Sequence, residues 1–166
     1  MPPRGRGDGP ITLSVLDRLI DDDPKRSEEL PLTRSQSLRE LKTSVCRDLE
    51  WLFNSRQALD APDTAKQVRN SLYAYGLPDI SSYSVSNVRE RKRLSLTLEE
   101  AVRLFEPRIL NPRVMLASTE EGKIQRVRFV IEGLLRVDPA PEPVSFDTML
   151  DMASGEYEVG GDSGAR

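Results

Sequence analysis

The chain has 166 residues, a formal net charge of −3, and 37% hydrophobic and 31% charged residues. These values are typical of one soluble domain with some disordered ends, and the absence of a basic surplus argues against a dedicated nucleic-acid-binding protein. The sequence contains no histidine, which excludes His-based metal sites and catalytic triads or dyads that need an imidazole. We therefore expect neither a metal nor a cofactor.

Cysteine usage and the apolar runs point to the cytoplasm. Cys46 is the only cysteine, so no intrachain disulfide can form, which fits a reducing compartment. No apolar run approaches the roughly 20 residues of a membrane helix, so direct membrane insertion is not expected. Residues 1–10, rich in Gly, Pro and Arg, are not followed by the apolar core of a secretory signal, and we expect them to be disordered.

Residues 11–20 form the first predicted element. Leu13, Leu16 and Leu19 lie at helical spacing on one face, and a charged linker follows, so residues 11–34 are expected to be a short helix with a linker. An isolated helix of this size is marginal and has to pack against something. It either folds onto its own domain or anchors the protein to a partner, and these three leucines would be the contacts of an anchor.

The strongest helix prediction covers residues 35–55. Six apolar side chains recur there at three- and four-residue steps: Leu38, Leu41, Val45, Leu49, Leu52 and Phe53. Ser35 or Ser37 can cap the start of this helix, because a serine hydroxyl accepts a hydrogen bond from an unpaired backbone N–H. Cys46 and Trp51 lie at the edges of the apolar stripe and are expected to pack rather than to react.

A shorter helix is predicted over residues 64–75, and the Gly-Leu-Pro-Asp sequence at 76–79 ends it. Residues 81–93 are expected to form a further helix or an irregular stretch. The charge run at 89–93 is more often a solvated face than a phosphate site, and we interpret it as such.

The next helix leads to a corner that carries two opposite charges. A capping box with Thr97 as N-cap and Glu100 three residues later predicts its start. The helix has to stop at Pro107, which cannot donate the next helical hydrogen bond and restricts the residue before it. Glu106 and Arg108 flank this proline. Such a pair can be a recognition device, a structural clip or half of a catalytic site.

Three runs with strand character follow, over residues 109–118, 126–137 and 142–152. In the last two runs, alternation assigns one face to the core: Val127, Phe129, Ile131, Gly133, Leu135 and Val137, then Val144, Phe146, Thr148, Leu150 and Met152. Two consecutive hairpins predict an antiparallel meander with one face on the helices. Pro112 is best tolerated at an edge or near the start of its strand.

The predicted fold class is α+β, with N-terminal helices followed by a three-stranded antiparallel sheet. The domain is expected over residues 35–152, and the Gly- and acid-rich residues 153–166 are expected to be a flexible tail. A three-stranded sheet has two exposed edges, whose backbone donors and acceptors can pair with another chain.

Several stretches of the chain together carry a resemblance to a known family. They are Ser14–Leu19, Ser37–Lys42 continued by Arg47–Asn54, Tyr75–Asp79 and Phe105–Leu110. The chain resembles the TssE family, the baseplate wedge subunits of bacterial type VI secretion systems. This family is related to the small wedge protein of contractile-tail phages and is often labelled lysozyme-like. The resemblance spans residues 11–152 in order.

The resemblance implies a non-enzymatic, cytoplasmic part of a contractile injection machine, assembled at a baseplate docked on the inner membrane. It implies the wedge proteins TssF, TssG and TssK as partners, and the sheath proteins TssB and TssC, whose assembly the subunit helps to initiate. The family's signature triplet maps onto Glu106, Pro107 and Arg108. We expect the two charged side chains to bind a wedge neighbour while the proline fixes their geometry, and an internal clip is the alternative.

Two other classes of function remain open. A peptidoglycan hydrolase of the lysozyme type needs two carboxylates about 5–10 Å apart across a cleft, and Glu99, Glu100 and Glu106 are the nearest candidates. However, Glu100 and Glu106 lie on different faces of a helix, and Arg108 favours the ionised form of Glu106, which does not suit a general acid. Aromatic residues make up only 5% of the chain, which is few for a sugar-binding groove. The other class is a free helical adaptor that binds through residues 11–20.

Overall fold

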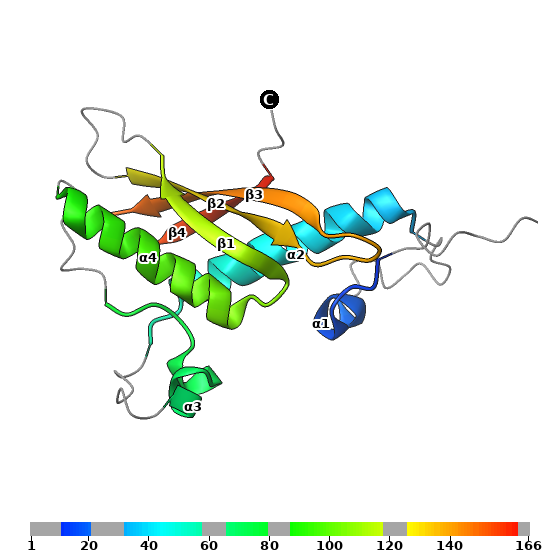
Figure 1. Ribbon diagram of the computed structural model, residues 1–166, viewed down its shortest axis with the longest axis horizontal. Helices are drawn as coiled ribbons and strands as arrows, with labels where there is room; N and C mark the ends of the chain where they lie inside the picture. Colours follow the sequence, from blue (N-terminus) through cyan, green and yellow to red (C-terminus); the bar gives the residue numbers. More distant parts are fainter. Residues whose placement is uncertain (1–10, 21–31, 58–65, 80–86, 118–125, 163–166) are drawn as a thin grey trace, which may run out of the picture.

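The computed structural model places a layer of helices on one face of a four-stranded sheet (Figure 1). It describes residues 11–20, 32–57, 66–79, 87–117 and 126–162. The helices are α1 (Val15–Leu19), α2 (Arg34–Asn54), α3 (Lys66–Arg69), a 3-10 turn η1 (Leu72–Ala74) and α4 (Val88–Phe105). The strands are β1 (Ile109–Leu116), β2 (Arg126–Leu135), β3 (Glu142–Asp151) and β4 (Tyr157–Asp162). The expected disorder of residues 1–10 lies outside the described residues.

The sheet has the order β1-β2-β3-β4, and each strand is antiparallel to the next. The predicted α+β class with helices before the sheet is confirmed, but the prediction of three strands is wrong. Residues 157–162, expected in a flexible tail, pair with β3 as a fourth strand. The glycines that suggested flexibility serve the hairpin instead, since Gly155 adopts φ +75° in the turn and donates its N–H to the Asp151 carbonyl.

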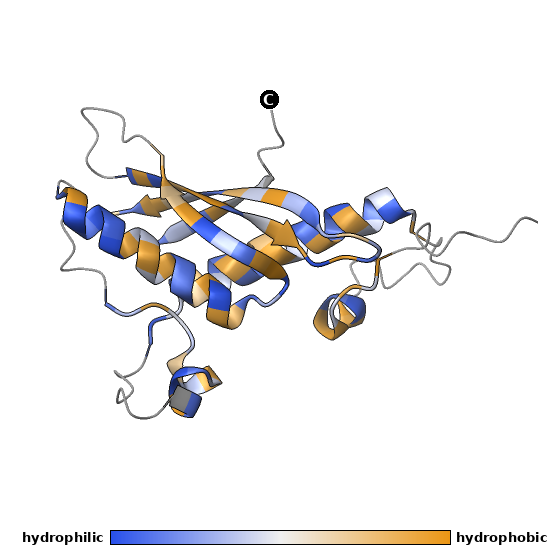
Figure 2. Cartoon of the chain, in the orientation of Figure 1, coloured by the Kyte–Doolittle hydropathy of each residue, from blue (hydrophilic) through white to orange (hydrophobic). Residues whose placement is uncertain are grey.

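The core lies between the sheet and the two long helices. α4 packs under β1 and α2 packs under β4. The apolar alternation of β2 and β3 is confirmed, because Val127, Phe129, Ile131, Phe146 and Leu150 are at most 1% exposed. The helices carry hydrophobic residues toward this layer and hydrophilic residues away from it (Figure 2).

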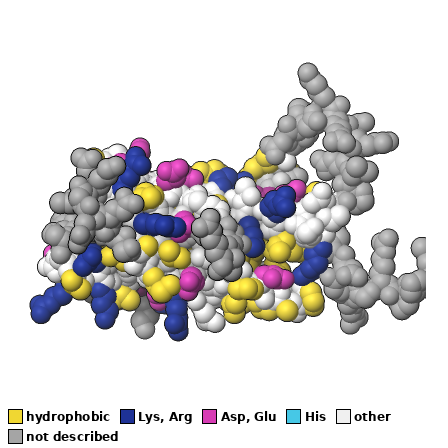
Figure 3. Space-filling model, turned by 90° about the horizontal axis from the view of Figure 1, so that it is seen from above, with side chains coloured by type: hydrophobic (Ala, Val, Ile, Leu, Met, Phe, Trp, Pro, Cys, Tyr) yellow, Lys and Arg dark blue, Asp and Glu magenta, His cyan; other side chains and the backbone are white. Residues whose placement is uncertain are grey.

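The other face of the sheet is a mixed surface. Arg128 of β2 pairs there with Asp147 of β3 at 2.7 Å. Met115 and Leu134 are exposed among such charges. Figure 3 views the molecule from above and shows hydrophobic and charged side chains interspersed. Among the described helices, none has the length and the apolar character that a bilayer-spanning segment requires.

The stripe predicted for α2 is confirmed, but its cap is not. Thr33 is the N-cap, and it forms a capping box with Gln36 in which each side chain bonds the other's backbone N–H. Ser37, offered as a cap, is instead buried and donates its hydroxyl to the carbonyls of Thr33 and Arg34. Trp51, expected to pack, is 52% exposed, and the Arg47 guanidinium lies 5.0 Å from its ring centre.

α4 is one helix where the sequence suggested two segments. Asn87 caps it by accepting the N–H of Arg89, so the capping box predicted at Thr97 is wrong. Thr97 lies inside the helix and donates its hydroxyl to the Arg93 carbonyl at 3.0 Å. The helix continues through this point because Leu94 extends the buried stripe by one turn before Leu98.

A backbone irregularity aligns the start of β1 with β2. The register shifts between Leu110 and Arg113, and Asn111 adopts φ +50° within this bulge. Pro112 sits in the bulge of an edge strand, as predicted. The adjoining position on β2 is Gly133, where an added Cβ would lie 2.5 Å from Ile109 Cγ2, so only glycine fits there without a shift.

The helix predicted over residues 64–75 is shorter than expected, since the described part holds only the one-turn α3 and η1. The chain then turns at Gly76, with φ +108°, and Leu77 forms a parallel bridge with Arg56. Leu77 donates its N–H to the Ser55 carbonyl at 2.8 Å, which ties this loop to the end of α2.

Replacing Gly76 with alanine tests this turn. The new Cβ would collide with the Ser55 carbonyl oxygen, and the backbone conformation disfavours any L side chain. We expect the Gly76→Ala variant to lose about 2 kcal/mol or more of unfolding free energy in urea titrations. Gly161→Ala is the matched control, because nothing lies within 4 Å of its Cβ position, and it should stay close to wild type. Equal stability of both variants would contradict the role of Gly76.

Candidate functional site

The corner between α4 and β1 is held by its backbone before any side chain is considered. Glu106 is the C-cap of α4 and donates its N–H to the Val102 carbonyl at 2.9 Å. Its own carbonyl accepts the N–H of Ile109 at 3.1 Å. The carbonyl of Arg108 accepts the N–H of Arg136 at 2.8 Å, which joins the corner to the end of β2. The geometry of Glu106 and Arg108 is therefore fixed on both sides of Pro107.

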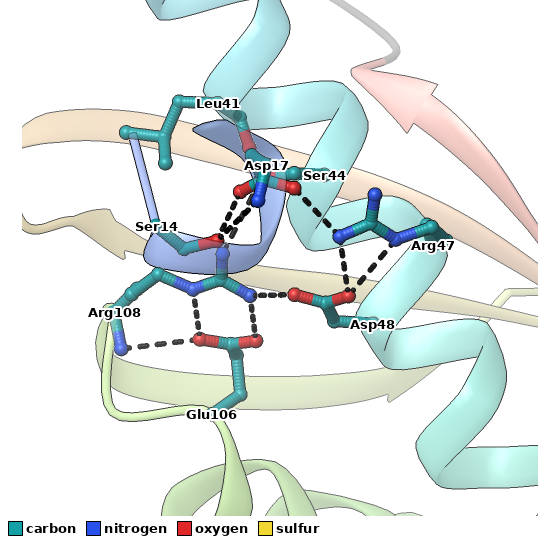
Figure 4. Close-up of polar contacts among 8 residues, drawn as sticks. All are labelled: Ser14, Asp17, Leu41, Ser44, Arg47, Asp48, Glu106 and Arg108. Carbon is teal, nitrogen blue, oxygen red and sulfur yellow. Dashed lines mark hydrogen bonds and ion pairs between the residues drawn. The ribbon is translucent and has the colours of Figure 1, made fainter. Parts of the chain in front are cut away.

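The two charged side chains of this corner bind each other. Arg108 Nε lies 2.6 Å from Glu106 Oε1, and Arg108 NH2 lies 2.5 Å from Oε2 (Figure 4). The backbone N–H of Arg108 also reaches Oε1 at 3.2 Å. The Glu106 residue is only 4% exposed. A bidentate guanidinium–carboxylate pair of this kind is both strong and directional, so the corner contains a buried ion pair.

Arg108 also reaches across to α2. Its NH2 lies 2.5 Å from Asp48 Oδ2, and its NH1 lies 3.3 Å from Ser44 Oγ. Burial alone would lower the pKa of Arg108, but its hydrogen bonds to Glu106 and Asp48, together with their negative charges, raise the pKa above the ordinary value. Arg108 is therefore a permanent cation that links the corner to α2.

A second arginine extends these contacts to the N-terminal segment. Arg47 donates to Asp48 Oδ1 from Nε and NH2, at 3.1 and 3.0 Å. Its NH2 also lies 2.7 Å from Asp17 Oδ1 in α1. Two guanidiniums thus alternate with three carboxylates, in the order Asp17, Arg47, Asp48, Arg108 and Glu106. We call these five residues the charge network (Figure 4).

Asp17 is the last anion of the charge network, at its α1 end. Burial would raise the pKa of its carboxyl, but the hydrogen bond with Ser14, the hydrogen bond and charge of Arg47, and a contact with Ser44 lower the pKa overall. Ser14 is at the same time the N-cap of α1, since its hydroxyl oxygen accepts the N–H of Asp17 at 3.1 Å. The cap of α1 and its attachment to α2 thus share the same side chains.

The polar side of α1 contacts α2, and several of its apolar side chains are exposed on the other side. The N–H of Ile11 donates to Ser37 Oγ at 2.9 Å, and Ile11 and Leu13 pack partly against the core. Leu16 and Leu19 are 48% and 76% exposed. The three candidate anchor residues are therefore not equivalent, because Leu13 faces its own domain while the other two face away.

The Tyr75–Asp79 stretch lies beside the charge network. The rings of Tyr75 and Phe105 meet edge to face, with centres 5.4 Å apart. Burial raises the pKa of the Tyr75 hydroxyl, and the negative charges of Asp48 and Glu106 raise it further. All of the stretches that carried the family resemblance are thus connected through one small region of the structure.

A comparison with known protein families supports the resemblance that these stretches carry. The model of a family described as baseplate wedge protein gp25 matches residues 39–140, more than half of the chain. The chain belongs to the baseplate wedge protein gp25 family. The resemblance to TssE is confirmed at this level, since TssE is the type VI homologue of the phage protein. Comparisons with curated proteins and with solved structures gave no match.

In this gp25-family chain, the structure brings Glu106 and Arg108 together and leaves Pro107 exposed between them. Sequence reasoning missed their partners in α2 and α1. The signal was present, because Arg47, Asp48 and Asp17 all lie in stretches that carry the resemblance. Their pairing was not readable, because the bonds join residues 30 and 60 positions apart.

The geometry suits holding surfaces in place better than acid–base chemistry. Both oxygens of Glu106 are bound by Arg108, and Glu99 is paired with Arg103 at 2.7 Å. No group of three or more Cys, Asp or Glu side chains in the described part of the chain could hold a metal ion. The gp25 family itself is that of a structural baseplate component, consistent with this arrangement.

Replacing Arg108, the cation bound to Glu106 and Asp48, tests how much the charge network contributes to the unfolding free energy. We expect Arg108→Met to lower the unfolding free energy by about 3 kcal/mol, because the buried carboxylate of Glu106 then lacks its guanidinium partner, while Asp48 keeps its contact with Arg47. Arg103→Met removes an exposed helical pair instead and should cost about 0.5 kcal/mol or less. Both values can be read from chemical denaturation. Similar losses in the two variants would show that the charge network adds no more than a surface ion pair.

The lowered pKa of Asp17 predicts how pH acts on α1. A carboxyl whose folded pKa lies below its unfolded value of 3.8 stabilises the fold above that value, and the contribution disappears as pH falls through the folded pKa. Wild type should therefore melt at a higher temperature than Asp17→Asn at pH 7, and the difference should vanish below the folded pKa. A difference that persists at the lowest pH would exclude Asp17 ionisation as its cause.

Proposed function

We propose that this protein is the TssE-type wedge subunit of a contractile type VI secretion apparatus. In this role it joins the wedge proteins TssF, TssG and TssK and helps the TssB–TssC sheath to begin on the baseplate. It acts in the cytoplasm, at a baseplate docked on the inner membrane, without catalysing a reaction. The observation that carries the proposal is the charge network, which locks the residues of the family stretches together and leaves an apolar helix face uncovered.

The uncovered face belongs to α1. Val15, Leu16, Leu19 and Ile20 are exposed, and none of the residues of α1 is buried. Figure 2 shows hydrophobic residues on this helix, which stands apart from the sheet layer. Apolar side chains gathered on one short element are a usual mark of a protein–protein contact. The face is held in a fixed orientation by the Asp17–Arg47 ion pair, so a wedge neighbour meets a prepared surface.

The corner supplies a second surface. Glu106 is buried, so its part is to hold the guanidinium of Arg108, whose side chain remains 23% exposed. Pro107 is exposed at the turn itself. We propose that Pro107 and the exposed part of Arg108 contact a wedge protein, while the ion pair sets their geometry. The clip and the partner contact are then two parts of one role.

Two exposed leucines of α1 provide a direct test. The double variant Leu16→Ser with Leu19→Ser removes apolar contact area without touching the charge network, so its melting temperature should stay near wild type. Co-purification with TssF, TssG and TssK should weaken by about tenfold or more, as for a central apolar contact.

Leu72→Ser is the matched control, because Leu72 is 84% exposed on a different element. It should bind the wedge proteins like wild type. Fluorescence imaging of the sheath gives the second readout, and cells carrying the α1 double variant should form few sheaths. Normal wedge binding and normal sheaths in these cells would exclude α1 as the contact. A chain that binds no wedge protein even as wild type would overturn the proposed function.

A further inference from the structure

A small pocket lies where three distant parts of the chain meet. Its lining comes from the end of α2 (residues 53–56), the loop at residues 77–79, and the β3–β4 hairpin between residues 150 and 157. The pocket has a volume of about 270 Å³. Sites for drug-sized ligands usually measure roughly 300–1,000 Å³. The volume of this pocket therefore suits a single large side chain better than a whole cofactor or nucleotide.

The pocket combines buried apolar and aromatic walls with charged side chains that are exposed. Phe53 and Leu77 line it and are themselves buried. The ring of Tyr157 also lies against the ring of Phe53, with centres 5.5 Å apart and planes tilted by 45°. Arg56 and Asp79 contribute to the lining and are exposed. An apolar centre with a polar rim is the composition of a pocket that receives one anchoring side chain at a protein interface.

Hydrogen bonds fix the walls of the pocket relative to each other. Leu77 donates its N–H to the Ser55 carbonyl at 2.8 Å, and its own carbonyl accepts the N–H of Gln57 at 2.9 Å. The side-chain amide of Asn54 bonds both the N–H and the carbonyl of Tyr157, at 2.8 Å each. The loop and the hairpin are thus both tied to the end of α2. Because the pocket is already formed, a ligand does not have to order it on binding.

The hydroxyl of Tyr157 is the polar group in this pocket that the fold does not explain. Tyr157 is only 3% exposed, and its hydroxyl is buried without a hydrogen bond to any described residue. Burial raises the pKa of this phenol above its ordinary value, so the hydroxyl keeps its proton and remains a donor. Buried polar groups are normally paired, because an unpaired one costs free energy. An acceptor atom brought into the pocket would supply the missing partner.

We propose that this pocket receives a tyrosine side chain of a partner protein, whose phenol oxygen accepts a hydrogen bond from the Tyr157 hydroxyl. The apolar walls favour an aromatic ring. Of the large aromatic side chains, phenylalanine has no polar atom and the indole of tryptophan only donates, whereas tyrosine carries an oxygen that accepts. The inference rests on the proposed function only for the expectation that the partner belongs to the same apparatus. The hairpin side of the pocket lies outside the residues matched by the family model.

Titration of the full-length, ¹⁵N-labelled chain tests the pocket. The two probes are N-acetyl-tyrosinamide and N-acetyl-phenylalaninamide, which differ by one oxygen atom. Amide signals of Leu77, Ser154 and Tyr157 should shift with both probes. The tyrosine probe should bind about fivefold more tightly, as for one neutral hydrogen bond. Burial of apolar area alone would favour the phenylalanine probe instead. Shifts centred on another part of the chain, or no preference for the tyrosine probe, would overturn the proposal.

Tyr157→Phe removes only the unpaired oxygen and tests its role. This variant should lose the preference for the tyrosine probe, and its melting temperature should not fall, because the oxygen makes no hydrogen bond with a described residue. Tyr73→Phe is the matched control, since Tyr73 is half exposed on η1, and it should keep the preference. A preference that survives in Tyr157→Phe would contradict the bond to the ligand. A lower melting temperature of this variant would show that the hydroxyl is already paired.

Free tyrosine distinguishes a side chain of a protein from a free amino acid. It carries an ammonium and a carboxylate group that a residue within a chain lacks. For a pocket that receives a side chain, free tyrosine should bind no more tightly than the blocked tyrosine probe. Binding about tenfold tighter would indicate a site for the free amino acid and would overturn the proposed partner. These measurements need no secretion protein, so their failure leaves wedge co-purification intact, and a failure of co-purification leaves probe binding intact.

Discussion

The guanidinium of Arg108 is the constraint on which the arrangement of this protein depends. A buried charge is tolerated only when other charges and hydrogen bonds replace its hydration. Here Glu106 at the end of α4 and Asp48 in the middle of α2 do so, at 2.5 Å each. The same contacts fix α2 against the corner where the sheet begins. Because both carboxylates have to lie within hydrogen-bond distance of one guanidinium, the position of α2 at the corner is specified more sharply than apolar packing alone would specify it.

The charge network also fixes the position of two exposed surfaces relative to the core. Arg47 continues it from Asp48 to Asp17, so the orientation of α1 depends on the residues that hold the corner. Two surfaces, the apolar face of α1 and the turn at Pro107, are thereby kept in a constant relation. The proposed function depends on such a relation, because in it the subunit joins several neighbours at defined angles. In the proposed function, the charges hold these two surfaces in place for recognition.

Short-range patterns in the sequence predicted much of this fold. The alternation of β2 and β3 and the apolar stripe of α2 each depend on neighbouring residues, and the structure confirms them. The glycines near β4 misled the prediction, because a glycine-rich strand that lies on a helix resembles a loose tail in composition. The start of α4 was misplaced because Thr97 and Glu100 match a capping box in the middle of a helix. The charge network was unreadable for a different reason. Its bonds join residues far apart in the chain, and only the fold brings them together.

Amide hydrogen exchange in α1 is the most direct measurement of whether the charge network acts as one unit. The N–H groups of Arg18 and Ile20 bond to the carbonyls of Ser14 and Leu16, so they report on the folding of this helix. In Arg108→Met, the network predicts faster exchange at both amides, although the side-chain hydrogen bonds of Arg108 go to Glu106, Asp48 and Ser44, which lie outside α1. In Arg103→Met, exchange should stay as in wild type. Unchanged protection of Arg18 and Ile20 in Arg108→Met would contradict the coupling between the corner and α1.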